Sequence, residues 1–244
     1  MALLEVNSLT KHFGGIAAVD GCSFAVETGS ITGLIGPNGA GKTTVFNLIS
    51  GLHKPDAGSI LFDGAPIDRL QPHQITRKGI SRTFQISRHL GELTVLENLV
   101  AQSPIDRFID LVKRSILYEE RDRAMDLLSF VGIADMAHET AAKLSYGQKK
   151  LMDLAAGLMA NPRLILLDEP AGGINPALLE VIVDRVQLLR KQGVTFLIVE
   201  HNMDVVMNVC DVVVVMAYGK CLAQGTPVAI QNDESVLEAY LGVA

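Results

Sequence analysis

The sequence predicts an α/β fold, in which a parallel sheet covered by helices is combined with an antiparallel β subdomain and an inserted helical subdomain. Short apolar runs rich in isoleucine, leucine and valine recur along the 244 residues, and each ends at a polar or glycine-bearing break. Strands that are apolar on both faces are typical of parallel sheets with helices on both sides. The runs that predict this sheet are Ser30–Ile35, Leu164–Leu167, Val194–Val199 and Val212–Met216.

Helical spacing predicts the segments that cover and interrupt this sheet. Apolar residues recur three and four positions apart in Pro176–Gln192, which indicates an amphipathic helix. Between Ser87 and Gly157 the strand signals vanish, and Asp106–Leu117 and Glu119–Val131 show helical spacing. The predicted divisions are residues 1–86 for the antiparallel β subdomain and the first part of the core, 87–157 for the inserted helical subdomain, and 158–244 for the second part of the core with the C-terminal helices.

The N-terminal region follows a different pattern. Apolar and polar residues alternate in Leu3–Val26 and again in Gly58–Asp63, with glycine breaks at Gly14, Gly15 and Gly64. Such alternation is typical of antiparallel strands joined by tight turns. We therefore expect a meander here.

The composition limits the classes of function. The formal net charge of −6 argues against a polybasic surface, so no nucleic-acid partner is expected. The apolar runs are shorter than the roughly 20 residues of a membrane-spanning helix, and the first residues lack the apolar stretch of a signal peptide, so we expect a cytoplasmic chain. Cys22, Cys210 and Cys221 show no metal-ligand spacing and are interpreted as small buried hydrophobic residues in a reducing compartment.

A glycine-rich segment follows the first apolar run. Residues 36–44 fit the pattern G-x-x-x-x-G-K-[ST] and lead into an expected helix, Lys42–Leu52, so that backbone N–H groups and the helix N-terminus face phosphate oxygens. This predicts a P-loop NTPase core, in which Lys42, as an exposed loop cation, reaches the β- and γ-phosphates of ATP and the Thr43 hydroxyl binds Mg²⁺. A glycine-rich turn that matches by accident is the alternative. The predicted nucleotide-binding residues are Gly36, Pro37, Asn38, Gly39, Ala40, Gly41, Lys42, Thr43 and Thr44.

Two adjacent carboxylates end the second apolar run. Asp168 and Glu169 directly follow Leu164–Leu167. An apolar strand with a carboxylate at its tip suits the aspartate that holds Mg²⁺ in P-loop NTPases, and Glu169 can orient or polarise the attacking water. The alternative is that the two carboxylates lie in a solvated turn or cap a helix. The presence of a P-loop in the same chain argues against this alternative.

A third segment, Leu144–Gln148, places Ser-x-Gly-Gln before a helical run, Lys149–Leu158. Together with the P-loop it resembles the signature motif of the ABC transporter ATPases. The resemblance implies that Ser145, Gly147 and Gln148 bind ATP held by the opposite subunit, in a homodimer or in a heterodimer with a related ATPase. An ordinary N-cap box formed by Ser145 and Gln148 is compatible with this role.

The resemblance covers essentially the whole chain and implies a RecA-like core. Phe13 stands where the family has an aromatic that stacks on adenine, although tyrosine is more usual there and core packing is the alternative. Gln85 matches the glutamine that senses Mg²⁺ and the γ-phosphate, and His201 matches the histidine that contacts the γ-phosphate. The implied catalytic residues are Lys42, Gln85, Glu169 and His201, and the implied metal-binding residues are Thr43, Gln85 and Asp168.

Two positions depart from the family pattern, because Tyr146 replaces the commonest glycine and Asn175 replaces an aspartate. With Phe84–Gln85, Glu200–Met203 and Glu238–Gly242, these departures resemble the branch that serves branched-chain amino-acid importers. Related systems for urea or amide import or lipopolysaccharide export share the last of these segments. A soluble ABC ATPase acting on DNA or the ribosome would usually carry a second cassette, a coiled-coil insertion or a basic extension, which this sequence does not show, and a small-molecule P-loop kinase would not need the signature segment.

The resemblance also implies partners and a location. The chain is expected to work with ATP and Mg²⁺ beneath separate membrane permease subunits, as a peripheral protein at the cytoplasmic face of the inner (plasma) membrane, and indirectly with a periplasmic substrate-binding protein. A cytoplasmic helix of the permease is expected to dock on Ser87–Leu99. Apolar residues around this segment serve either docking or the core, namely Ile86, Leu90, Leu93, Val95 and Leu96.

Overall fold

The computed structural model describes residues 1–83, 90–103 and 118–241, and these ranges contain two sheets. The larger sheet has six strands in the order β10-β9-β3-β8-β7-β6, and only β10 runs antiparallel to its neighbour. The four predicted apolar runs form β3, β7, β8 and β9, so the predicted parallel sheet is confirmed. The strands are β3 (Ile31–Ile35), β6 (Ile80–Arg82), β7 (Leu164–Asp168), β8 (Thr195–Val199), β9 (Val212–Ala217) and β10 (Lys220–Gly225).

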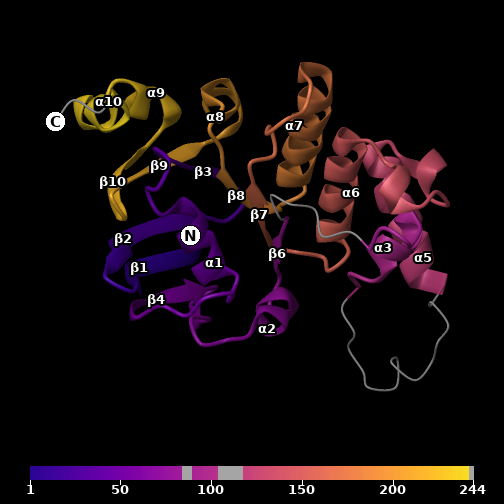
Figure 1. Ribbon diagram of the computed structural model, residues 1–244, viewed down its shortest axis with the longest axis horizontal. Coiled ribbons are helices and arrows are strands. Elements are labelled where there is room, and N and C mark those ends of the chain that lie inside the picture. The colour runs from indigo at the N-terminus through magenta and orange to yellow at the C-terminus, as the bar shows by residue number, and fades with distance from the viewer. Residues whose placement is uncertain (84–89, 104–117, 242–244) are drawn as a thin grey trace.

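The smaller sheet is antiparallel, as the N-terminal alternation predicts, but the expectation of a meander is wrong, because the strands are not neighbours in chain order. Its order is β2-β1-β4-β5, with β1 (Ala2–Phe13), β2 (Ile16–Glu27), β4 (Ala57–Phe62) and β5 (Ala65–Pro66). Helix α1 (Lys42–Ile49) lies between this sheet and the central one (Figure 1). Its side chains share a hydrophobic cluster with residues of both sheets, among them Leu4, Val6, Leu34 and Leu166.

Helices α7 (Pro176–Lys191) and α8 (Met203–Val209) cover the opposite face of the central sheet (Figure 1). Alternate residues of β7 point to opposite faces, as a strand requires. Leu164 and Leu166 pack in the cluster around α1, whereas Ile165 and Leu167 pack in the cluster around α7. Short helices α2 (Pro72–Arg77), α9 (Pro227–Gln231) and α10 (Glu234–Leu241) lie at the edges.

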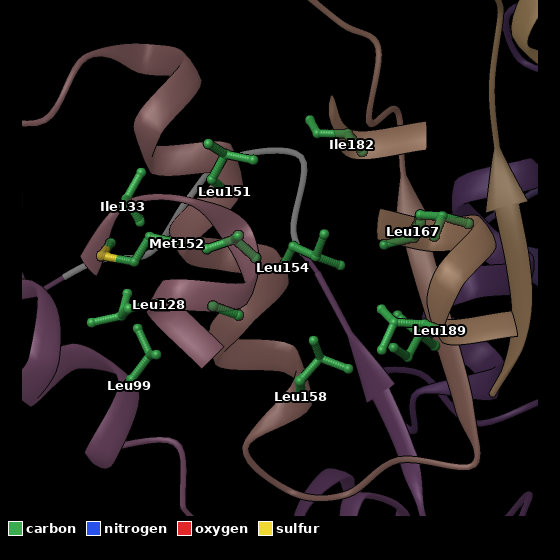
Figure 2. Packing of buried hydrophobic residues seen from close by; sticks show 14 of the residues in the cluster. Leu99, Leu128, Ile133, Leu151, Met152, Leu154, Leu158, Leu167, Ile182 and Leu189 are labelled. Atoms are coloured by element: carbon green, nitrogen blue, oxygen red, sulfur yellow. The ribbon is translucent and has the colours of Figure 1, made fainter. Parts of the chain in front are cut away.

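The described part of the predicted insertion is built from α3 (Val95–Val100), α5 (Tyr118–Val131) and α6 (Tyr146–Leu158). Helix α6 packs against α3 and α5 on one side and against β7 and α7 on the other, and its leucines bridge the two sets in Figure 2. The helical region and the sheet therefore share one hydrophobic cluster. The boundaries at 86/87 and 157/158 stay predictions, and Asp106–Leu117 lies outside the described residues.

Cys22 in β2 and Cys221 in β10 form a disulfide with a Cα–Cα distance of 5.1 Å. The interpretation of all three cysteines as simple buried hydrophobic residues is therefore wrong for this pair, because the fold brings β10 against β2. Cys210 is free, and burial raises the pKa of its thiol to about 12, so the thiol stays protonated at neutral pH. None of the helices in the described ranges is long and apolar enough to cross a bilayer.

Candidate active site

The P-loop connects the end of β3 to the start of α1 in a conformation that needs glycine. Gly36, Gly39 and Gly41 have φ values of 149°, 83° and 102°, which L side chains rarely adopt. A Cβ added at Gly36 would clash with the carbonyl oxygen of Met216, and one added at Gly41 would clash with that of Ala18. Gly36 and Gly41 are the two glycines that the sequence pattern specifies, and the conformation of the loop allows no side chain at either position.

A cleft of about 210 Å³ opens over this loop and the N-terminus of α1. Glu169 follows β7 and His201 lies just beyond β8, so both reach the cleft from the same edge of the parallel sheet, where such folds bind ligands. One cleft therefore collects most of the predicted nucleotide-binding residues with three of the predicted catalytic residues. Its lining is Ala18, Asn38, Gly39, Ala40, Gly41, Lys42, Thr43, Thr44, Glu169 and His201.

Lys42 is buried, with only 5% of its surface exposed, so the expectation of an exposed loop cation is wrong. Its Nζ donates hydrogen bonds to the carbonyl oxygens of Gly36 at 2.7 Å and Pro37 at 2.9 Å. Burial lowers the pKa of Lys42, and the negative charges of Glu169 and Asp168 act in the opposite direction. The P-loop folds back over its own lysine, which holds the ammonium group at the floor of the cleft.

Asp168 ends β7 and is bound by a buried arginine that the sequence analysis missed. Its Oδ2 accepts a hydrogen bond from Nη2 of Arg82 at 2.9 Å, and the two side chains are 2% and 7% exposed. Arg82 also donates to Asn47 Oδ1 at 2.7 Å and to Ser50 Oγ at 3.0 Å. One cation thus connects the aspartate to the helix that follows the P-loop. No local pattern marks Arg82, since its burial depends on β6 pairing with β7.

The donor set fits Mg²⁺. Thr43 in the first turn of α1 offers a hydroxyl oxygen and Asp168 a carboxylate. Mg²⁺ prefers oxygen ligands and is usually held by one or two protein groups together with substrate phosphates. The described residues contain no group of three or more His, Cys, Asp or Glu side chains that could hold a metal alone. Phosphate oxygens would therefore have to complete the coordination.

Replacing Arg82 by methionine is expected to lower the free energy of unfolding by about 3–5 kcal/mol, because it leaves the carboxylate of Asp168 buried without its cation. Urea unfolding curves measure this loss. The double variant Arg82→Met/Asp168→Asn should recover much of the lost free energy, since it no longer buries an unpaired carboxylate. Arg163→Met, which breaks the exposed ion pair with Asp63, is the control and should leave the midpoint almost unchanged. Equal midpoints for Arg82→Met and the wild type would contradict this account.

Glu169 and His201 are in direct contact. Glu169 Oε1 lies 2.9 Å from His201 Nε2, and the backbone of Glu169 has a φ of 50°. Glu200, which is 3% exposed, fixes the surrounding loops by accepting hydrogen bonds from the backbone N–H groups of Ala171, His201 and Asn202. Its supporting role was not predicted, and its position next to His201 was the only local signal. The carboxylate and imidazole together can hold and polarise a water molecule beside a phosphate.

The signature segment forms the expected cap of α6. Ser145 Oγ accepts a hydrogen bond from the N–H of Gln148 at 3.3 Å, and Gln148 Oε1 accepts one from the N–H of Ser145 at 2.8 Å. The N-cap interpretation is therefore confirmed. Ser145, Gly147 and Gln148 are not among the described residues that line the P-loop cleft. Their contact with ATP stays a prediction, and it requires a second chain.

Phe13 lies at the end of β1 with 45% of its surface exposed, so the core-packing alternative is wrong for it. Its ring meets that of His53 edge-on, with centroids 5.3 Å apart, and stacking on adenine stays a prediction.

Asn175 caps α7, where its Oδ1 accepts a hydrogen bond from the N–H of Leu178 at 2.9 Å. Gln85 lies outside the described residues.

Most of the chain matches two families of known proteins. Residues 19–172 match the family described as ABC transporter, and residues 220–244 match the one described as branched-chain amino acid ATP-binding cassette transporter. The chain belongs to the ABC transporter family of ATP-binding cassettes. Members of this family couple ATP hydrolysis to transport, so this chain is an ATPase.

Relatives of this cassette match it over nearly its whole length. A high-affinity branched-chain amino acid transport ATP-binding protein, BraF, of Pseudomonas aeruginosa is 41% identical, covering 99% of this chain and 98% of the relative. A probable branched-chain amino acid transport ATP-binding protein, LivG, of Archaeoglobus fulgidus is 40% identical, covering 99% and 96%.

Solved structures show the same cassette fold. The ADP conformation of an ATP-binding cassette of an ABC transporter superposes with a TM-score of 0.89 at 36% identity, covering 99% of each chain. A dimeric bacterial ABC transporter cassette gives a TM-score of 0.80 at 26% identity, covering 92% of this chain and 98% of that one. The predicted α/β cassette architecture is therefore confirmed.

Proposed function

We propose that this cassette hydrolyses ATP to drive the import of branched-chain or other hydrophobic amino acids through separate permease subunits. The observation that supports the hydrolysis step is the single cleft that brings together the P-loop, Lys42, Glu169 and His201. Backbone N–H groups and Lys42 hold the β- and γ-phosphates, and Glu169 orients the attacking water while His201 steadies the carboxylate. When bound through Thr43 and Asp168, Mg²⁺ neutralises phosphate charge.

The working unit is a dimer, either of two copies of this chain or of this chain with a related ATPase. The signature segment of one chain lies outside its own cleft, so it is available to the ATP of another chain. The dimeric cassette structure that resembles this chain supports such a pairing. ATP between the P-loop of one subunit and Ser145 of the other then holds the dimer closed, and hydrolysis opens it.

The permease is proposed to dock where the sheet meets the helical region. A cavity of about 200 Å³ lies there, with Arg82, Asn98 and Asp153 among its lining. Within the predicted docking segment Leu90 is 55% exposed and fits a contact, whereas Val95 and Leu96 are buried and belong to the core. Leu93 is half-buried, and Ile86 lies outside the described residues. Docking here would place the chain at the cytoplasmic face of the inner membrane, opposite a periplasmic substrate-binding protein.

Uptake of labelled solutes tests the proposal. Cells that lack this chain are expected to lose most of their high-affinity uptake of ¹⁴C-leucine and ¹⁴C-isoleucine at low concentration and to keep uptake of ¹⁴C-urea. The wild-type chain should restore uptake, and Glu169→Gln should not. In the same cells the chain should sediment with membranes only when the permease subunits are produced. Unchanged leucine uptake together with lost urea uptake would assign the cassette to an amide importer instead.

A further inference from the structure

The N-terminal turn of α6 binds the loop that follows Glu169 in the same chain. The Tyr146 hydroxyl donates a hydrogen bond to the carbonyl oxygen of Gly172 at 3.2 Å. Its ring lies against Gly173, where an added Cβ would be only 3.2 Å from Cε1 of the ring. Tyr146 therefore covers this loop with its ring and holds it with its hydroxyl, and the glycine that is commonest at this position of the signature motif has neither group.

Lys150, one turn further along α6, binds the same loop at its start. Its Nζ donates a hydrogen bond to the backbone carbonyl oxygen of Glu169 at 3.2 Å, and it lies 5.7 Å from the ring centroid of Tyr146. Lys150 is 8% exposed, so the contact is largely shielded from water. A non-glycine residue with a φ of 50°, such as Glu169, keeps that backbone conformation only when its surroundings hold it. Lys150 is one of the groups that do so.

The first turn of α6 also contacts the first turn of α7. A Cβ at Gly147 would clash with the side chain of Leu178, and the two helices stand side by side in Figure 1. Further along α6, Leu154 reaches toward Leu167 of β7, as Figure 2 shows. Chains of packed side chains and hydrogen bonds carry coupling between sites, so these contacts and the two hydrogen bonds connect the start of α6 to the loop after Glu169.

We propose that Tyr146 and Lys150 are positioning residues, which transmit the state of the signature segment, Ser145–Gln148, to Glu169 in the chain's own active site. When α6 moves onto ATP held by the opposite subunit, the two carbonyl groups bound by these side chains move with it, and so does the backbone of Glu169. The inference rests on the proposed function, in which Ser145 faces ATP on another chain. Each active site thereby becomes competent only when the other one is filled.

Matched variants of the full-length chain separate this role from a structural one. Tyr146→Phe keeps the ring and removes only the hydroxyl, and Lys150→Met keeps the length and removes the cationic donor. We expect kcat to fall about fivefold in the first and about tenfold in the second, with KM for ATP unchanged in both and the melting temperature unchanged in Tyr146→Phe. The Hill coefficient for ATP should fall toward that of independent sites in both. Lys150→Arg, which keeps a cationic donor, and Tyr118→Phe, at the exposed start of α5, should behave like the wild type.

Two results would overturn the inference. One is wild-type kcat and cooperativity in both Tyr146→Phe and Lys150→Met. The other is a loss of kcat that comes with an equal rise in KM and an early melt, since that pattern indicates general destabilisation. Failure of the proposed ATP-dependent dimer looks different, because the Glu169→Gln chain would then form no dimer with ATP and both proposals would fall. If that dimer forms while the two variants hydrolyse ATP normally and cooperatively, only the positioning role is wrong.

Discussion

The Glu169→Gln variant is expected to bind ATP but to turn it over roughly 10²–10⁴ times more slowly than the wild type. In the wild type, Glu169 Oε1 lies 2.9 Å from His201 Nε2. Glutamine keeps the size of the side chain and an oxygen that can accept a hydrogen bond from this nitrogen. It removes the negative charge that orients or deprotonates the attacking water. Phosphate release and equilibrium binding of a fluorescent ATP analogue measure the two steps separately.

The same variant should accumulate the closed dimer, because ATP then stays between the subunits. Size-exclusion chromatography should show a dimer with ATP and a monomer with ADP, and adding Ser145→Arg should abolish the dimer by placing a bulky side chain at the partner's γ-phosphate. Glu180→Gln, an exposed substitution on α7, is the matched control and should hydrolyse ATP normally. Normal turnover by Glu169→Gln would remove Glu169 from the catalytic step.

The features that the sequence predicted correctly have local causes. The P-loop glycines, the strand before them and the helix after them lie within 19 consecutive residues, 31–49. The cap of α6 depends on Ser145 and Gln148, three positions apart, whose side chain and backbone groups satisfy each other. Continuous apolar runs located β3, β7, β8 and β9 for the same reason, since a strand buried on both faces shows its burial in its own composition.

The features that escaped prediction depend on which strands become neighbours. Arg82 and Asp168 are 86 residues apart, and they meet because β6, a strand of three residues with little signal of its own, pairs with β7. The disulfide joins cysteines 199 residues apart across β2 and β10. Burial of Lys42 follows from the way the P-loop wraps its side chain, which a pattern of residue types does not record. The hydrophobic cluster that α6 shares with the sheet was not predicted either, because it joins segments far apart in the chain.

Replacing Lys42 by alanine is expected to lower ATP turnover by at least about 10²-fold, since it removes the cation that meets the phosphate charge as it develops. Because Lys42 is buried and donates hydrogen bonds to Gly36 and Pro37, we also expect a measurable loss of stability, about 1–3 kcal/mol, although the desolvated ammonium group partly offsets it. Turnover and a thermal melt should be recorded together, with exposed Lys54→Ala as the control. A folded Lys42→Ala chain with wild-type turnover would show that this lysine maintains the shape of the P-loop and takes no part in hydrolysis.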